Sequence, residues 1–239
     1  MEKPTRVLVP SPAQRRAGRA ALTQAATRRR RFEKELLAAL GPALKGSGWK
    51  KSGGVLFRQS GVMFQEVGVS VSLLDGTVGV TQKIKPMALD PILWDILGLT
   101  ENASAPLSFR ATGAFTCGGL PIGEASLDET GDGLAATLAA LVGIVGDTGR
   151  LAEQTLAGAD FSALVAQHPN QAQRGAYAVT LVTSLINDGD RDAAVRLAGA
   201  YLSGTARACA NLRCDGVSFH RLALDWLAAQ TSADAGNRP

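Results

Sequence analysis

The chain has 239 residues, of which 46% are hydrophobic and only 5% aromatic, and it carries 25 Lys/Arg against 21 Asp/Glu. This composition fits an ordinary soluble protein with enough core for one large domain or two small ones. Three cysteines argue against a disulfide scaffold and fit a reducing cytoplasm, so we expect a cytoplasmic protein.

The positive charge is concentrated at the N-terminus. Residues 1–31 contain nine Lys/Arg and one acid, Glu2, whereas the other 208 residues contain 16 Lys/Arg and 20 Asp/Glu. The sequence pI of 9.2 therefore describes a basic arm on a mildly acidic body. It does not mark the whole chain as a nucleic-acid-binding protein.

Residues 1–31 are predicted to be a flexible basic arm. Ser11 and Pro12 are suited to begin a helix, but Leu22 is the one sizeable apolar residue of the helix they would begin. Such an arm could bind a polyanion, serve for targeting or lipid contact, or be a solvated extension. A signal peptide is not indicated, because no apolar segment follows the basic residues. The candidate polyanion-binding residues are Arg15, Arg16, Arg19, Arg28, Arg29, Arg30 and Arg31.

The next part, residues 32–128, has the pattern of an α+β domain. Phe32, Leu36 and Leu40 recur every four residues and predict a helix, which Gly41–Pro42 should kink or split. Apolar residues then alternate with smaller or polar ones in segments 55–58, 67–73 and 78–84, and Asp75-Gly76 is a hairpin signal. These segments predict a three-stranded antiparallel meander. A helix over 86–99, a strand over 106–117 and a short edge strand over 120–125 should follow.

From residue 131 the apolar period is helical. It predicts an all-helical region over residues 131–230, with helices near 134–156, 161–167, 177–186, 194–201 and 217–229, and a loose tail over 231–239. The apolar run 133–145 is shorter than the roughly 20 residues that span a bilayer, so we expect a buried helix and no membrane span. The fold class is therefore α+β, an N-terminal helix and a small meander sheet followed by helices.

No catalytic, cofactor-binding or metal-binding residue is assigned. Cys209, Cys214 and His220 lack the fourth ligand and the spacing of a structural zinc site. The acids Asp188 and Asp190 resemble a calcium loop only at its start, and they fit better as acids that cap the next helix. A carboxylate site assembled in space stays open as an alternative. Its example members are Glu66, Asp90 and Asp95.

A second basic concentration lies in the α+β domain. Its candidate surface patch consists of Trp49, Lys50, Lys51, Lys83 and Lys85, in which the last two lie two apart on one strand and so share a face. The alternative is a set of lysines that protect an edge strand.

The stretch 32–85 resembles the opening of an uncharacterised family of bacterial domains of unknown function. A helix in that family runs into Leu-Lys-x-x-Gly-Phe-Lys-Lys, then a strand with an aromatic residue and Arg, then a strand with Gln-Lys. The matching residues here are Leu44 to Lys51, with Trp49 in place of Phe, followed by Phe57-Arg58 and Gln82-Lys83. The resemblance implies a bacterial, cytoplasmic α+β protein, and some relatives are suspected immunity or accessory proteins of bacterial competition systems. It supplies no catalytic residues.

Three functions remain in view. The first is a non-enzymatic, immunity-like or accessory protein that binds a protein partner. The second is a protein that binds nucleic acid or another polyanion through the arm. The third is an enzyme whose site is not visible in the sequence.

Overall fold

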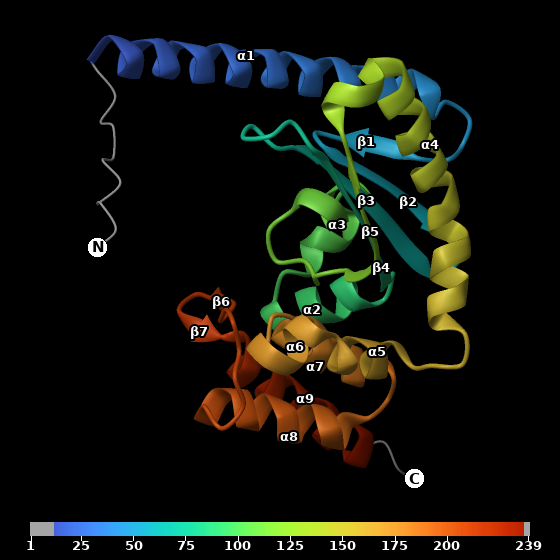
Figure 1. Cartoon of the computed structure of the whole chain (residues 1–239). Coiled ribbons are helices and arrows are strands. Elements are labelled where there is room, and N and C mark those ends of the chain that lie inside the picture. Colours follow the sequence, from blue (N-terminus) through green and yellow to red (C-terminus); the bar gives the residue numbers. More distant parts are fainter. Residues whose placement is uncertain (1–11, 237–239) are drawn as a thin grey trace, which may run out of the picture.

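The centre of the molecule is a five-stranded antiparallel sheet in the order β1-β2-β3-β4-β5 (Figure 1). The computed structural model describes residues 12–236 and, within them, the side chains of residues 19–128 and 133–232. A hairpin joins β3 to β4 at Asp75-Gly76 as predicted, but its loop is longer than the two-residue turn that this dipeptide signals, since the Ser72 amide bonds to the Thr77 carbonyl. The strands are β1 (Lys50–Ser52), β2 (Val55–Ser60), β3 (Met63–Val71), β4 (Val78–Pro86) and β5 (Leu120–Leu127). The α+β prediction is confirmed.

Two long helices, α1 (Pro12–Ala43) and α4 (Glu129–Leu156), cover one face of this sheet. Leu36 and Leu40 of α1 and Leu141 and Val145 of α4 are buried against the apolar residues of β2, β3 and β4. The strict alternation along β4 places Val78, Val80, Gln82 and Ile84 on this buried side. The sheet and these two helices form the first core.

The remaining elements form a helical layer at the far end of the sheet (Figure 1). The helices are α2 (Leu89–Leu97), η1 (Thr100–Ser104), α3 (Phe109–Thr112), α5 (Phe161–Gln167), α6 (Pro169–Arg174), α7 (Ala178–Asn187), α8 (Arg191–Ser203) and α9 (Phe219–Gly236). A two-residue hairpin of β6 (Arg213–Cys214) and β7 (Val217–Ser218) precedes α9.

The sheet and the helical layer share a second core. Ile84 and Leu120 of the sheet and Leu93 of α2 belong to the same buried cluster as Val182 of α7 and Phe219 of α9. Helix α4, which the sequence groups with the helical region, instead packs mainly on the sheet. A boundary between residues 128 and 131 therefore does not divide the structure into separately packed parts.

Several local predictions are wrong. Segment 106–117 is not a strand but irregular chain around the short helix α3, because its backbone carbonyls face a buried lysine rather than a neighbouring strand. Helix α1 continues unbroken through Gly41–Pro42 to Ala43, since Pro42 falls in its last turn. Strand β1 was not predicted, and α9 continues through residues 231–236, which we expected to be loose.

Residues 12–31 belong to the same helix as the core residues Leu36 and Leu40. The predicted helix start at Pro12 is confirmed, whereas Ser11 and the rest of residues 1–11 lie outside the described residues. The flexibility of the arm stays a prediction. The structure does show the direction of residues 12–31, which extend away from the body along the axis of helix α1, whose C-terminal half is packed on the sheet (Figure 1).

Helix α4 also bears on the expectation of no membrane span. Within the described residues, segment Gly133–Leu156 is the single helix that is long and apolar enough to cross a bilayer by length and composition, with a mean hydropathy of 1.4. The apolar run is thus longer in the structure than the sequence pattern indicates. One face of the helix packs on the sheet through Leu141, Val145 and Thr148. Only 22% of its apolar stretch is buried, so the helix is partly exposed rather than buried as predicted.

Candidate polyanion-binding surface

The structure brings the arm and part of the second basic concentration together. Arg30 and Lys34 lie one helical turn apart on α1 and line a groove of about 440 Å³ together with Lys51 of β1. The floor of the groove includes the Gly53–Gly54 turn between β1 and β2. Three cationic side chains from two separate segments therefore face one hollow, with Glu33 as the acid in its lining.

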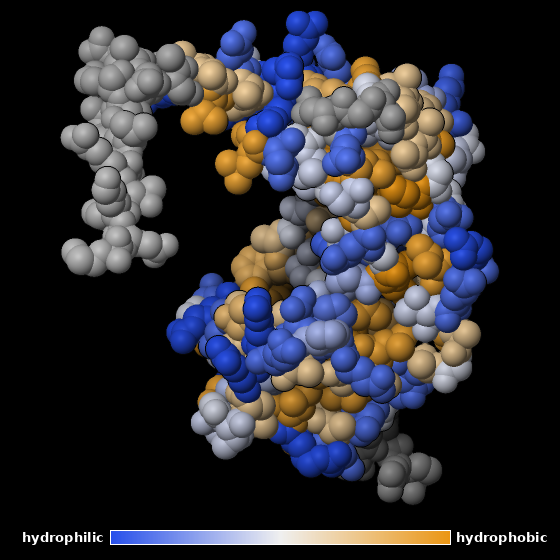
Figure 2. All heavy atoms as spheres, viewed as in Figure 1, coloured by the Kyte–Doolittle hydropathy of each residue, from blue (hydrophilic) through white to orange (hydrophobic). Residues whose placement is uncertain are grey.

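The neighbouring side of α1 continues this positive surface. Arg28 and Arg31 lie three residues apart and are both exposed. Arg31 donates a hydrogen bond of 2.8 Å to Glu35, and this bond together with the Glu35 charge raises the pKa of the guanidinium. Figure 2 shows hydrophilic residues gathered over this part of α1. We refer to Arg28, Arg30, Arg31, Lys34 and Lys51 as the basic surface.

Arg29 has a structural role instead. Its guanidinium donates hydrogen bonds to the backbone carbonyls of Leu73 and Leu74, at the tip of the β3–β4 hairpin. This contact ties the hairpin to the helix at the point where α1 leaves the body. Arg19 is exposed further out, and Arg15 and Arg16 belong to the same helix, although their side chains lie outside the described set.

The other members of the predicted patch do not form one surface. Lys50 and Lys51 are neighbours on β1 and point to opposite faces. Lys83 forms an ion pair of 3.3 Å with Glu66, its cross-strand partner on β3. Lys85 is buried, with 1% of its surface exposed, so its assignment to a surface patch is wrong.

Trp49 is half-buried rather than displayed. The guanidinium of Arg58 lies 4.7 Å from the centre of the indole ring, and Trp49 packs against the core beneath α1. Arg58 also donates a hydrogen bond of 2.7 Å to Gln65, and burial lowers the pKa of its guanidinium. The indole face is therefore already occupied by a cation of the protein itself.

The charge of the chain differs between its N-terminal elements and the rest. Residues 12–60, which hold α1, β1 and β2, contain twelve Lys/Arg and two acids. Residues 61–239 contain eleven Lys/Arg and eighteen acids. The positive charge is thus concentrated in residues 12–60, and the excess of acids is largest in residues 118–156, which contain six acids and one arginine.

Lys85 belongs to a buried charge cluster that sequence reasoning missed. Its ammonium donates hydrogen bonds to Asp90 at 2.9 Å and to the backbone carbonyls of Arg110 and Cys117 at 2.9 and 2.8 Å. Asp90 also accepts from the Arg110 guanidinium at 3.1 Å and from the Cys117 amide at 2.8 Å. Every partner of the ammonium is polar, and the Phe64 ring lies 5.4 Å away.

This cluster is closed to substrates. The side chains of Lys85 and Asp90 are 2% and 0% exposed, so a reactant could reach them only if the structure opened. Burial, reinforced by the Asp90 charge, raises the pKa of the Cys117 thiol to about 12, which keeps it protonated and unreactive at neutral pH. We interpret the cluster as a structural junction between the sheet, α2 and segment 106–118.

The other acids of the predicted carboxylate site lie apart. Glu66 pairs with Lys83 on the sheet, and Asp95 accepts a hydrogen bond of 2.8 Å from the indole of Trp226. The prediction that acids cap the helix after residue 187 is confirmed at Asp190, whose carboxylate accepts from the Ala193 amide at 3.0 Å.

The Cys209, Cys214 and His220 side chains do not converge either. Cys209 is exposed, the Cys214 thiol points to the Leu97 carbonyl, and His220 is buried. The His220 ring stacks on Tyr201, with ring centres 4.8 Å apart, and neither of its nitrogens has a hydrogen-bond partner. Among the residues that the structure describes, no group of three or more His, Cys, Asp or Glu side chains is placed to hold a metal ion.

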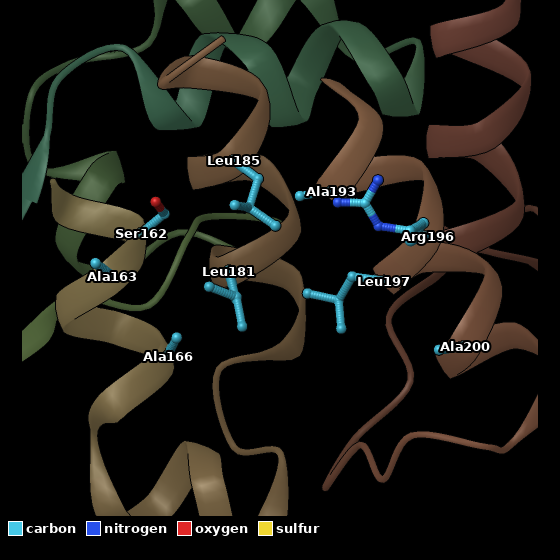
Figure 3. Close-up of a pocket in the computed structure, with 9 residues that line it drawn as sticks. All are labelled: Ser162, Ala163, Ala166, Leu181, Leu185, Ala193, Arg196, Leu197 and Ala200. Atoms are coloured by element: carbon cyan, nitrogen blue, oxygen red, sulfur yellow. The ribbon is translucent and has the colours of Figure 1, made fainter. Parts of the chain in front are cut away.

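An apolar groove lies in the helical layer, away from the basic surface. It has a volume of about 600 Å³ and runs between α5, α7 and α8 (Figure 3). Leu181 and Leu185 of α7 and Leu197 of α8 point into it, and Arg196 lies at one side. Small residues complete its walls.

Comparisons with known proteins add no assignment. No protein family, no curated protein and no solved structure matches this chain. The resemblance of residues 32–85 to a family of unknown function stays a prediction.

Proposed function

We propose that this protein binds double-stranded nucleic acid, without sequence selectivity, through the basic surface. The proposal rests on one observation: Arg30 and Lys34 of α1 and Lys51 of β1 all line the same groove. Phosphates of a duplex are recognised mainly by lysine and arginine, and clustered cations on one face are the usual signature of such binding.

The state of Trp49 favours a duplex over a single strand. Proteins that bind single strands combine cations with aromatic side chains on which the bases stack. Trp49 is the aromatic residue of the predicted patch, and the Arg58 guanidinium covers its ring. A duplex needs no stacking partner, because its bases already stack on one another. Helix α1, of 32 residues and about 48 Å, carries two groups of cations, within residues 15–19 and 28–34, that can contact the backbone of a duplex at separate points.

An immunity-like or accessory role, in which the protein binds another protein, remains the second candidate. The apolar groove between α5, α7 and α8 supports it, because exposed apolar hollows are common binding sites for protein segments. A cytoplasmic location suits both functions. An enzymatic function has less support, since the one cluster of interacting charged groups that we find in the described residues is closed to solvent.

The test is a fluorescence-anisotropy titration of the full chain with a duplex of about 20 base pairs, repeated between about 50 and 300 mM salt. If five phosphates are neutralised, log K should fall with log salt at a slope of about −4.5. A variant with Gln at positions 28, 30 and 31, in place of arginine, should lower that slope to about −1.8.

The matched control replaces the exposed residues Arg174, Arg207 and Arg221 of the helical layer with Gln. It changes the net charge by the same amount and should leave the slope unchanged. Equal loss in both variants, or affinity that does not depend on salt, would reject the proposal. Single-stranded DNA and vesicles containing anionic lipid complete the experiment, and tighter binding to either than to the duplex would also reject it.

A further inference from the structure

The apolar stripe of α1 extends beyond the body that it covers. Leu36 and Leu40 on this stripe are buried on the sheet, whereas Leu22, fourteen residues before Leu36 and on the same side of the helix, is 73% exposed. Ala25 and Ala26 lie between them and are half-buried. Figure 2 shows apolar atoms along the lower side of α1 where it leaves the body. Within the described side chains, the overhanging part thus has a small-residue face that carries one exposed leucine.

The apolar groove has the complementary shape. Its walls alternate leucine with alanine, from Ala163 and Ala166 on α5 to Ala193 and Ala200 on α8 (Figure 3). Alanine walls let a helix approach closely, and a volume of about 600 Å³ is more than one leucine side chain needs. The groove therefore fits a slender, alanine-rich helix better than a bulky aromatic one.

The end of the groove near the α7–α8 turn is acidic. Asp188 accepts a hydrogen bond of 3.1 Å from the amide of Ser162, and Asp190 accepts one of 3.0 Å from the amide of Ala193. Ser162 and Ala193 both line the groove, so these two carboxylates lie at its rim. The exposed Asp160 and Asp192 are next to the same residues along the chain, and the opposing cations there are Arg191 and Arg196.

We propose that the overhanging half of α1 in one copy of this chain docks into the groove between α5, α7 and α8 of a second copy. Leu22 enters between Leu181, Leu185 and Leu197, and the arginines of α1 lie against the acidic rim. The local charges agree, since residues 12–28 contain four arginines and no acid, whereas the rim has four aspartates against two arginines. The proposal does not depend on nucleic-acid binding.

A chain cannot fill its own groove in this way. Helix α1 lies at one end of the molecule and α5, α7 and α8 at the other (Figure 1). The contact is therefore head-to-tail, and it leaves a free helix on one copy and a free groove on the other. The overhang, residues 12–28, is about 25 Å long. An interface of that length falls in the weak class below about 1,200 Å², so association should depend strongly on concentration.

The experiment is sedimentation velocity of the full chain up to about 200 µM, a range that reveals weak interfaces. Salt is kept near 0.1 M, where the Debye length is about 10 Å. Dimers and larger species should grow with concentration. Leu22→Glu on the helix and Ala166→Arg in the groove should each leave a monomer. Leu74→Glu, at a site that is 91% exposed, and Ala172→Arg on α6 are the matched controls and should associate like the original chain.

Mixing the two defective proteins gives the decisive result. Leu22→Glu keeps a working groove and Ala166→Arg keeps a working helix, so an equimolar mixture should form a 1:1 dimer and nothing larger. A chain that stays monomeric at every concentration would overturn the proposal. So would association that survives either variant, or a mixture that fails to dimerise although circular dichroism shows both variants to be folded.

Discussion

The Lys85 ammonium lies 2.9 Å from both carboxylate oxygens of Asp90, and neither side chain is reached by solvent. The two residues come from different elements, the end of β4 and the first turn of α2. The Arg110 guanidinium and the Cys117 amide donate the remaining hydrogen bonds to the carboxylate. Taking two charges out of water is costly unless such additional hydrogen bonds are made, and here they are.

Removing one partner of this pair should therefore lower the free energy of unfolding. Asp90→Asn removes the negative charge and leaves the buried ammonium with neutral acceptors alone, and we expect a loss of about 3–5 kcal/mol. The measurement is urea denaturation followed by circular dichroism. The control is Glu66→Gln, which breaks the partly exposed pair with Lys83 and should cost less than about 1 kcal/mol. Similar losses in both variants would contradict the structural role of the cluster.

The sequence predicts the sheet well because one of its faces is buried. The alternation of Val78, Val80 and Ile84 and the hairpin at Asp75-Gly76 are local signals, and the structure confirms both. Segment 106–117 was predicted wrongly because its backbone carbonyls form hydrogen bonds with side chains that are distant in sequence, and not with a neighbouring strand. Phe115 supplies a carbonyl to the Trp94 indole, and Cys117 supplies one to Lys85.

The candidate site was predicted in part. The arginines of α1 stand out by composition, but their proximity to Lys51 depends on how α1 crosses the sheet. Lys85 was misplaced because a strand pattern assigns a residue to a face and does not say whether that face is covered. The partner that would have revealed its burial, Asp90, lies only five residues later, yet a lysine and an aspartate at that distance are unremarkable in any sequence.

The two neighbouring lysines of β1 provide a sharp test of the basic surface. Lys51 faces the groove with Arg30 and Lys34, whereas Lys50 points to the other side of the sheet. Lys51→Glu should weaken duplex binding about three- to tenfold at low salt, since it removes one phosphate contact and adds a repulsion. Lys50→Glu has the same charge and should change affinity by less than about twofold. The check is fluorescence anisotropy on both variants, and equal weakening would show that only net charge matters.

Nucleic acid and self-association should compete, because the docking overhang (residues 12–28) and the basic surface share Arg28 and adjoin each other on α1. Adding a duplex of about 20 base pairs to the concentrated protein should dissociate the oligomers into complexes with one chain per binding site. Sedimentation velocity with labelled duplex measures this directly. A duplex bound to intact oligomers would mean that at least one of the two assignments to α1 is wrong, and the Leu22→Glu variant identifies which.

His220 should make stability depend on pH on the acid side of neutrality. Burial lowers the pKa of its imidazole from the ordinary value of 6.5, since its nitrogens have no partner to stabilise a charge. Below about pH 6.5 the unfolded chain takes up a proton that the folded chain refuses, so the free energy of unfolding decreases as the pH falls toward the lowered pKa. Above pH 6.5 both states are neutral at this residue, and it contributes no pH dependence.

His220→Phe keeps an aromatic ring against Tyr201 and removes the titration. Its stability, measured by urea denaturation between about pH 5 and 7.5, should therefore fall less on the acid side than that of the original chain. His168→Asn is the comparison, because the His168 ring accepts a hydrogen bond from the Asn170 amide and asparagine retains a capping acceptor there. That variant keeps His220 and should therefore keep the part of the acid-side loss that His220 causes. If His220→Phe keeps the same loss, the acid sensitivity arises from other groups.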